Sequence, residues 1–326
     1  MNIPRRRFLQ LAAGAAAFPA TTRFARAQAF PARPVHLVAG FAAGSASDIN
    51  ARLVGQWLSE RLGQPFIIDN RAGAGGNIAT EFVVRAPADG YTLLYASTAI
   101  AINETLYAGK LSFNAQKDLA PVAGVVRTPV VMEVNPDFPA KNVTEFIAYA
   151  KANPGKINYA TIGAGTLQHL TAEYFKMMTG IDMVPVHYRG AAQAIPDLMA
   201  GRVQVMFDIV VSSLSYINAG QLRPLAVATP APHELLPGIP TISETLPGFG
   251  AGGWQGVCAP SKTPADIVEK LNSEINTVLA DPKLKTRLVE LGGQPTPGTP
   301  AEWGKFIADE TDKWGKVVRE AGLKTD

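Results

Sequence analysis

The pattern of apolar and small residues along positions 35–62 predicts a strand, a loop and a helix. Residues 35–39 form a short apolar run typical of a buried strand. The loop that follows has small side chains, so a ligand can approach its backbone closely. Ser45 and Asp48 have the spacing of a capping box, which predicts the helix start, and Gly63 predicts its end. We expect its apolar face to be Ile49, Leu53, Trp57, Leu58 and Leu62.

This helix start is a candidate anion site. The first N–H groups of a helix have no intrahelical partner and carry a partial positive charge. A carboxylate or phosphate can therefore bind there without any Lys or Arg, and residues 41–48 contain neither. The same pattern also fits an ordinary turn between a strand and a helix, so both interpretations stay open.

Strands and helices go on alternating further along the chain. Residues 65–68 predict a strand, residues 69–77 a second glycine-rich loop, and residues 78–86 a helix. A third strand at 91–95 leads to Ser97 and Thr98. Such alternation implies a parallel sheet, and ligands of these sheets bind beyond the carboxyl ends of the strands. We expect both hydroxyls to lie near the first loop.

A second unit of the same kind begins near residue 156. A strand at 156–160 leads to a small-residue loop at 161–166, and Thr166 is the expected N-cap of a helix. A further strand at 203–207 ends at Asp208. If the two small-residue loops face each other, a cleft between two lobes results. The chain then ends with helices that begin near Pro264 and Pro282, and at 303–321.

The first 29 residues predict an export signal that is removed. Three arginines at 5–7 precede a short apolar run at 9–20, and A-x-A cleavage sites end at Ala27 and Ala29. The run is too short to span a bilayer. The arginines suggest twin-arginine export, and general secretory export stays open. Five of the 30 basic residues and none of the 27 acidic ones lie in this segment, so the mature chain has a net charge of −2.

Charge and cysteine content narrow the range of partners. The mature chain has no basic patch with interleaved aromatic residues, so we expect no nucleic-acid partner. Cys258 is the only cysteine of the sequence and cannot form an internal disulfide. Its apolar neighbours predict a small core residue.

The sequence offers little catalytic chemistry. None of the four histidines has a second ligand at metal-binding spacing, so we expect no metal, and the glycine-rich loops lack complete cofactor-binding motifs, so we expect no cofactor. Asp48, His169 and Asp208 could act as acid and base groups in a secreted hydrolase or lyase. Helix capping, a structural hydrogen bond and pocket lining explain them equally well.

Several segments together identify a family. They are residues 40–48, 69–77, 88–94, 153–160, 163–169, 188–190, 220–226 and 254–260. In these segments residues 30–326 resemble the extracytoplasmic solute receptors of tripartite tricarboxylate transporters, also called Bug receptors. The resemblance implies an α/β fold of the type II periplasmic-binding-protein class, with a ligand cleft between two lobes. Lobe 1 would be 30–128 and 253–326, lobe 2 would be 129–252, and strands near 125–131 and 253–257 would cross between them.

The resemblance also implies a function. A monomeric periplasmic receptor without enzymatic activity would capture a small organic anion, mostly a carboxylate, for the membrane permease subunits of such a transporter. A sensor that presents its ligand to a membrane signalling partner is an alternative. The sequence departs from the usual family pattern at Gly40, Ser45 and His187, so the identity of the ligand cannot be transferred from a relative. The expected ligand-binding residues are Phe41, Ala43, Gly44, Ser45, Ser47, Asp48, Ser97, Thr98, Gly163, Gly165, Thr166, His169, Tyr188 and Asp208.

Overall fold

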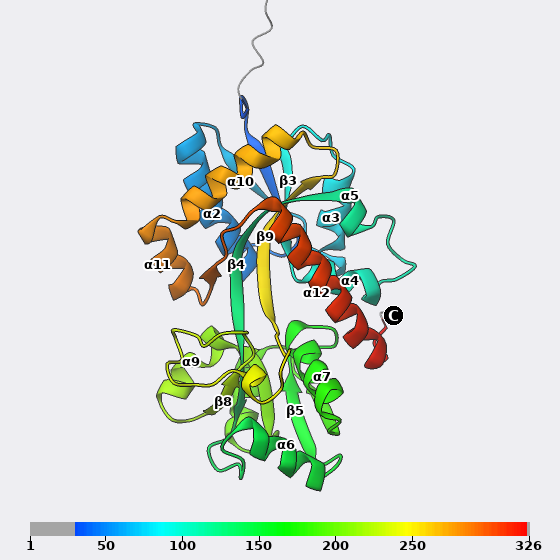
Figure 1. Cartoon of the computed structure of the whole chain (residues 1–326), viewed down its shortest axis with the longest axis vertical. Coiled ribbons are helices and arrows are strands. Elements are labelled where there is room, and N and C mark those ends of the chain that lie inside the picture. The colour runs from blue at the N-terminus through cyan, green and yellow to red at the C-terminus, as the bar shows by residue number, and fades with distance from the viewer. Residues whose placement is uncertain (1–29, 325–326) are drawn as a thin grey trace, which may run out of the picture. The chain divides into compact units, whose positions relative to one another are not determined.

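The computed structural model describes residues 30–324 (Figure 1), so the export signal predicted for residues 1–29 lies outside the described residues. From Arg33 onward the described residues form one compact unit. No helix in the described part of the chain is both long and apolar enough to cross a membrane.

A ten-stranded sheet organises this unit, in the order β2-β1-β3-β9-β4-β7-β5-β6, with β8 and β10 also paired to β4. Its strands are β1 (Val35–Ala39), β2 (Phe66–Asn70), β3 (Thr92–Ser97), β4 (Leu119–Val134), β5 (Ile157–Thr161), β6 (Met183–His187), β7 (Val205–Ile209), β8 (Arg223–Val227), β9 (Gly252–Pro260) and β10 (Gln294–Pro295). The predicted parallel units are confirmed, because β1 runs parallel to β2 and β3, and β5 runs parallel to β6 and β7.

The long strand β4 belongs to both halves of the sheet. Its first part pairs with β9, from Leu119 opposite Pro260 to Pro129 opposite Gly252, and Figure 1 shows the two strands side by side. Its last part, from Val130 onward, pairs with β7 and β8. β9 also pairs with β3. The two halves of the sheet are therefore joined through β4, and the proposed lobe boundaries stay a prediction.

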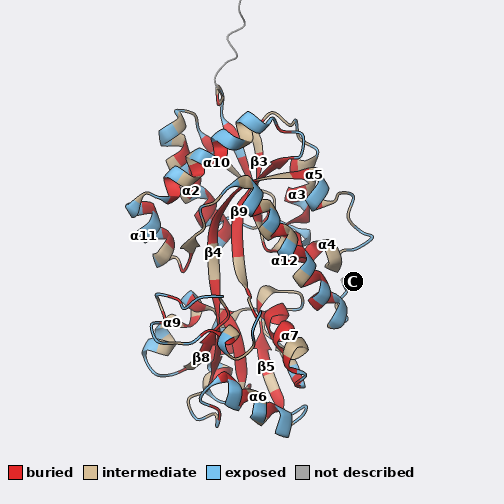
Figure 2. Ribbon diagram, in the orientation of Figure 1, coloured by how far each residue is buried: buried red, intermediate tan, exposed pale blue. Residues whose placement is uncertain are grey.

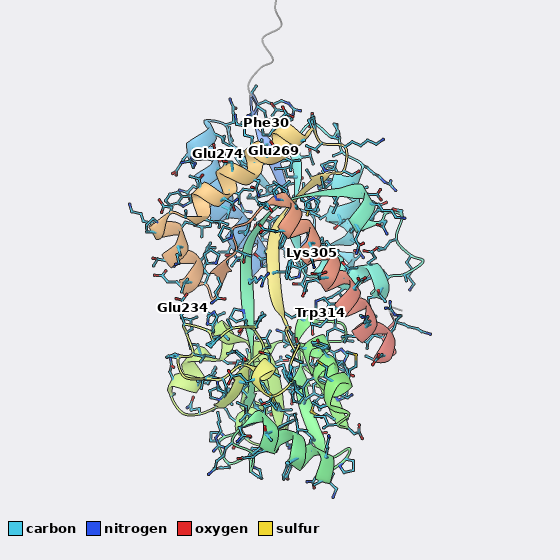
Figure 3. All side chains as sticks on the ribbon, viewed as in Figure 1. Phe30, Glu234, Glu269, Glu274, Lys305 and Trp314 are labelled. Carbon is cyan, nitrogen blue, oxygen red and sulfur yellow. The ribbon has the colours of Figure 1, made fainter. Side chains whose placement is uncertain are left out.

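Helices cover the sheet on its faces. They are α2 (Ala46–Leu62), α3 (Asn77–Val84), α4 (Ala99–Leu106), α5 (Ala115–Asp118), α6 (Val143–Ala152), α7 (Leu167–Thr179), α8 (Ala191–Met199), α9 (Val210–Asn218), α10 (Ala265–Leu279), α11 (Pro282–Glu290) and α12 (Pro300–Glu320), with short 3-10 turns η2 (Ala74–Gly76) and η3 (Ile242–Glu244). α10 packs against α2, where Arg61 pairs with Glu274 at 2.8 Å (Figure 3). Figure 2 shows the strands largely buried and the outer helix faces exposed.

The apolar face predicted for α2 is wrong in part. The structure buries Leu58 as expected, together with Ala51, Val54 and Gly55, whereas Ile49 is 41% exposed. Gly55 explains the difference, because a Cβ at that position would lie 3.0 Å from Ile68 of β2. Small residues let the helix lie close to the sheet, and the bulkier side chains are displaced to its flanks.

Tryptophans of α12 and β9 form the centre of the core beneath the first half of the sheet. Trp254 of β9 meets Trp303 of α12 edge to face, with ring centroids 5.2 Å apart. Gly256 makes this contact possible, since a Cβ there would lie 2.5 Å from the Ala123 carbonyl oxygen and would also strike the Trp303 ring. Cys258 is buried in the same cluster, as predicted.

Candidate functional site

The first loop leads into α2 through the predicted cap. Ser45 is the N-cap, and its hydroxyl accepts a hydrogen bond from the Asp48 N–H at 3.3 Å. The Asp48 carboxylate in turn accepts one from the Gly44 N–H at 2.9 Å. Ala46 and Ser47 occupy the first two helical positions, where N–H groups have no intrahelical acceptor. Whether these two N–H groups hold an anion stays a prediction.

The sequence interpretation missed Arg52, a basic residue next to this loop. Its guanidinium contacts both carboxylate oxygens of Asp48, at 2.9 and 3.0 Å, and donates to the Asn70 side chain at 3.0 Å. Burial by itself raises the pKa of the Asp48 carboxyl, but hydrogen bonds from Arg52 and Gly44 outweigh it and the net shift is downward. The spacing of four residues between an acid and a base on a helix could have revealed the pair. The negative charge of the Asp48 carboxylate is therefore balanced by Arg52, and the same carboxylate binds the Gly44 N–H of the loop.

The second glycine-rich loop supports the first. The Asn70 amide donates to the Phe41 carbonyl at 3.0 Å, and the Arg71 N–H donates to the Ala39 carbonyl at 2.8 Å. A Cβ on Gly40 would lie only 2.8 Å from the Gly76 Cα, so the two loops are in close backbone contact. This contact holds the first loop in place and accounts for glycine at position 40.

The loop before α7 has the predicted cap as well. Thr166 is the N-cap, and its hydroxyl accepts from the His169 N–H at 3.4 Å and donates to the Gly163 carbonyl at 2.8 Å. Gly165 has a φ of +72°, which favours glycine, and a Cβ there would lie 2.9 Å from Leu106 of α4. α4 follows directly from the carboxyl end of β3, so the second loop lies against an element that begins beside the first. Whether the two loops face each other across a cleft stays a prediction.

His169 lies in the first turn of α7, where the sequence left both a ligand contact and a structural hydrogen bond open. Its ring is buried, and its Nδ1 accepts a hydrogen bond from the Gly165 N–H at 3.0 Å. The ring stacks on Tyr159, with centroids 6.1 Å apart. Burial lowers the pKa of His169. The structure thus shows the structural hydrogen bond, and a direct contact with a ligand stays a prediction.

The hydroxyls at the end of β3 are already bonded within the protein. Thr98 accepts a hydrogen bond from the Trp254 N–H at 2.9 Å, which ties the start of α4 to β9. Ser97 accepts a weaker one from the Ala99 N–H at 3.4 Å. β1 and β3 are parallel neighbours, so both hydroxyls lie at the same edge of the sheet as the first loop. Their expected place is confirmed, and their role with a ligand stays a prediction.

Tyr188 and Asp208 also have protein partners. The Tyr188 hydroxyl donates to Asp197 at 2.8 Å, which together with burial raises the pKa of Tyr188 to about 12. Asp208 is fully buried and accepts from the Gln168 amide of α7 at 3.3 Å. In this conformation Asp208 therefore holds the first turn of α7, and the expected contact of either residue with a ligand stays a prediction.

A second buried carboxyl, Glu133, lies beside Asp208. The Ser213 hydroxyl donates to Glu133 at 2.6 Å and lies 3.4 Å from Asp208. Burial raises the pKa of Glu133 to about 8 and also raises that of Asp208. This shift favours the protonated form of Glu133 at neutral pH. No sequence pattern indicated this pair, because Glu133 lies in an otherwise apolar run at the end of β4.

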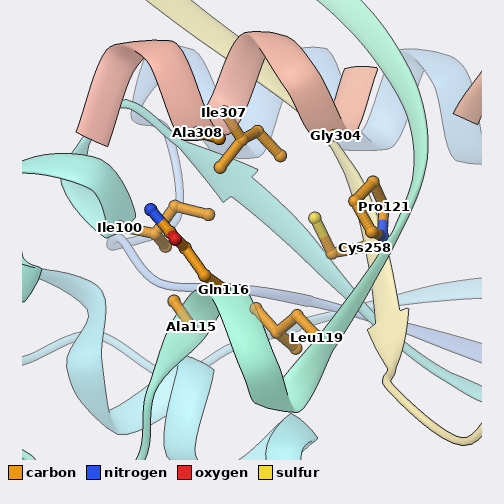
Figure 4. A pocket seen from close by; sticks show the side chains of 9 residues that line it. All are labelled: Ile100, Ala115, Gln116, Leu119, Pro121, Cys258, Gly304, Ile307 and Ala308. Carbon is orange, nitrogen blue, oxygen red and sulfur yellow. The ribbon is translucent and has the colours of Figure 1, made fainter. Parts of the chain in front are cut away.

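An apolar cavity of about 230 Å³ lies apart from these loops, between α12, α5, β4 and β9 (Figure 4). Gln116 is the one side chain in its lining with a strong hydrogen-bonding group, and burial raises the pKa of the Cys258 thiol there to about 12. The cavity offers no cationic group for an anion. Within the described residues, no three His, Cys, Asp or Glu side chains come close enough together to hold a metal ion.

Comparison with known proteins adds to this geometry. The family model described as "Tripartite tricarboxylate transporter family receptor" matches residues 50–323. The protein BugT of Bordetella pertussis is 36% identical over 303 residues, which cover 91% of this chain and 92% of BugT. The solved structure of Rpa4515 from R. palustris with adipate is 36% identical, has a TM-score of 0.74, and covers 91% of this chain and 100% of its own. MatC from Rhodopseudomonas palustris with bound malate is 31% identical, has a TM-score of 0.70, and covers 89% of this chain and 100% of its own.

Proposed function

We propose a function that proceeds from one fact: this chain belongs to the tripartite tricarboxylate transporter receptor family. Its fold is the predicted α/β fold of two-lobed periplasmic binding proteins. The protein is a receptor that binds a small organic carboxylate, as the related structures with adipate and malate support. It has no enzymatic activity, acts in the periplasm as a monomer, and delivers its ligand to the membrane permease subunits of a tripartite tricarboxylate transporter.

The observation that carries this function is the pair of capped helix starts. α2 begins after Ser45 and α7 begins after Thr166, each preceded by a loop of small residues. The first N–H groups of both helices are oriented by these caps and lack intrahelical acceptors. We infer that they hold the carboxylate, with help from side-chain hydroxyls and water. Lobe 1 (30–128 and 253–326) and lobe 2 (129–252) would each supply one helix start.

Calorimetry with adipate and malate on a Thr166→Ala variant tests this arrangement. In the ligand-free loop the Thr166 hydroxyl donates to the Gly163 carbonyl, and we infer that a bound carboxylate takes over this donor. A hydrogen bond to a charged group contributes about 1.5–3 kcal/mol, so the variant should bind about tenfold to a hundredfold more weakly. Thr277→Ala is the matched control, because Thr277 is exposed and its hydroxyl donates to the Ser273 carbonyl of its own helix, α10. This control should bind with unchanged affinity.

The competing account is a salt bridge from Arg71 or Arg189. Arg71 already pairs with Asp69 at 3.0 Å, and its guanidinium lies 3.5 Å from the centroid of the Phe82 ring. If Arg71→Ala or Arg189→Ala abolishes binding while Thr166→Ala has little effect, the helix-start arrangement is wrong. Ligand recovered chemically unchanged after incubation supports a receptor, and turnover would show a hydrolase or lyase.

A further inference from the structure

The loop before α7 is fixed by the ring of His169. The Gly165 N–H donates to the His169 Nδ1 at 3.0 Å, so the ring one turn into the helix holds the residue before the N-cap. On its other side Gly165 is packed against Leu106. Together with the bond from the Thr166 hydroxyl to the Gly163 carbonyl, this hydrogen bond helps to set which way the backbone of residues 163–166 faces, and with it the orientation of the N–H groups at the start of α7.

This hydrogen bond requires a neutral ring. A nitrogen that accepts a hydrogen bond carries no proton, so the proton of the neutral ring lies on Nε2. A protonated ring would carry a second N–H at Nδ1, pointing at the Gly165 N–H. Two donors would then face each other in a partly buried site, and the loop would have to move to separate them.

The surroundings of the ring favour the neutral form. Glu173 lies 4.0 Å from Nε2, but it already accepts from the Tyr159 hydroxyl at 2.5 Å and from Lys176 at 2.8 Å. His187 meets the ring edge to face, with centroids 5.3 Å apart. Burial lowers the pKa of His169; Glu173 opposes this shift, and His187 and Lys176 add to it.

We propose that His169 is a positioning residue that holds residues 163–166 ready for the anion as a neutral ring and releases them when the ring takes up a proton. This inference rests on the proposed function for the effect on ligand affinity, but the change in the loop belongs to the protein alone. Carboxylate binding should therefore weaken in acid through the loop itself, in addition to any loss from protonation of the ligand.

Substitution by Asn separates the hydrogen bond from the titration. The Asn side-chain oxygen can accept from the Gly165 N–H and does not titrate. At pH 7.5, His169→Asn should bind adipate or malate within about threefold of the wild type, and His169→Ala should bind about tenfold more weakly. As the pH falls from 7.5 to 4.5 the wild type should lose affinity progressively relative to His169→Asn, and most of the loss should come at the acid end because burial lowers the pKa of His169. The ratio of the two affinities cancels the effect of ligand protonation, which is the same for both proteins.

His233→Asn is the matched control. His233 is also buried, burial lowers its pKa, and its Nδ1 accepts from the Leu235 N–H at 3.2 Å. It therefore has the same chemistry away from the loop of residues 163–166. His233→Asn should leave the affinity and its pH dependence unchanged, and an effect equal to that of His169→Asn would overturn the proposal.

NMR of the ligand-free protein gives a readout that does not depend on the ligand. The Gly165 amide resonance should shift with the titration of the His169 ring in the wild type and stay constant in His169→Asn. If the Gly165 amide resonance does not change as the His169 ring titrates, the inference is overturned. It is also overturned if the affinity of the wild type rises in acid relative to that of His169→Asn. If no variant binds a carboxylate at any pH while Gly165 still follows His169, the proposed function fails and the loop mechanism stands.

Discussion

At the scale of one residue, the buried carboxyl of Glu133 predicts how the stability of the folded protein depends on pH. The pKa of Glu133 is about 8 in the folded protein against 4.5 for an ordinary Glu, so the folded state retains a proton that the unfolded state releases. Stability should therefore fall as the pH rises from about 4.5 to about 8. Glu133→Gln stays neutral, and by pH 8.5 it should be more stable than the wild type by an amount on the order of a few kcal/mol.

Urea unfolding at pH 5 and pH 8.5 measures this difference. Glu320→Gln is the control, because Glu320 is exposed at the end of α12 and its loss should not change the pH dependence. A gap between the wild type and Glu133→Gln that does not widen with pH would contradict the assignment of a neutral Glu133.

Individual residues were predictable where their partners are local. Ser45 and Thr166 were identified as caps because each bonds within its own helical turn. The contact between Glu133 and Ser213 joins positions 80 residues apart, and no local pattern specifies it. His169 lies between these cases: its position in the first turn was evident, but the bond to Gly165 depends on the path of the loop.

At the scale of elements, β9 should not tolerate a side chain at position 256. Gly256 lies between the Trp303 ring and the backbone of β4. Gly256→Ala should destabilise the protein by about 3 kcal/mol, because a rigid strand and a packed ring must both move. Gly190→Ala is the control, since its φ of 175° suits any residue and nothing lies within 4 Å of an added Cβ.

Thermal unfolding of the two variants checks this prediction. Equal losses would show that the contact between β9 and α12 adapts readily.

The bounds of α2 could be read from its capping residue and its terminal glycine. Its buried face could not be predicted, because it depends on the contact of Gly55 with Ile68 of β2, a strand that follows the helix in the chain.

At the scale of the whole molecule, we expect ligand binding to close the two lobes about β4 and β9, because in the proposed site each lobe would supply one helix start. Trp254 of β9 and Trp314 of α12 both donate to Glu310, at 3.2 and 2.8 Å. Trp314 also meets Tyr174 of α7, with ring centroids 6.3 Å apart (Figure 3). Closure should therefore change both the scattering profile and the tryptophan fluorescence.

Small-angle scattering with saturating malate or adipate, compared with the corresponding neutral diamide, measures closure. Identical profiles in the presence of a ligand that binds by calorimetry would count against it.

The repeated order of strand, loop and helix was enough to predict the parallel parts of the sheet. The insertion of β9 between β3 and β4 was not predictable from that order, because it joins positions more than 120 residues apart. The family resemblance implied only that strands near 125–131 and 253–257 cross between the lobes.

The place of β9 in the sheet has a consequence for the order of synthesis. The strands β5 to β8 and their partner segment of β4 are complete once residue 227 has been made. β3 and β4 are joined in the sheet only through β9, which the ribosome reaches at residues 252–260. Trp254 of β9 can pack against Trp303 only after α12 has been made at 300–320. A nascent chain therefore completes the half with the second loop first. The half with the first loop, although its residues are made earliest, is completed only by the last helix of the chain.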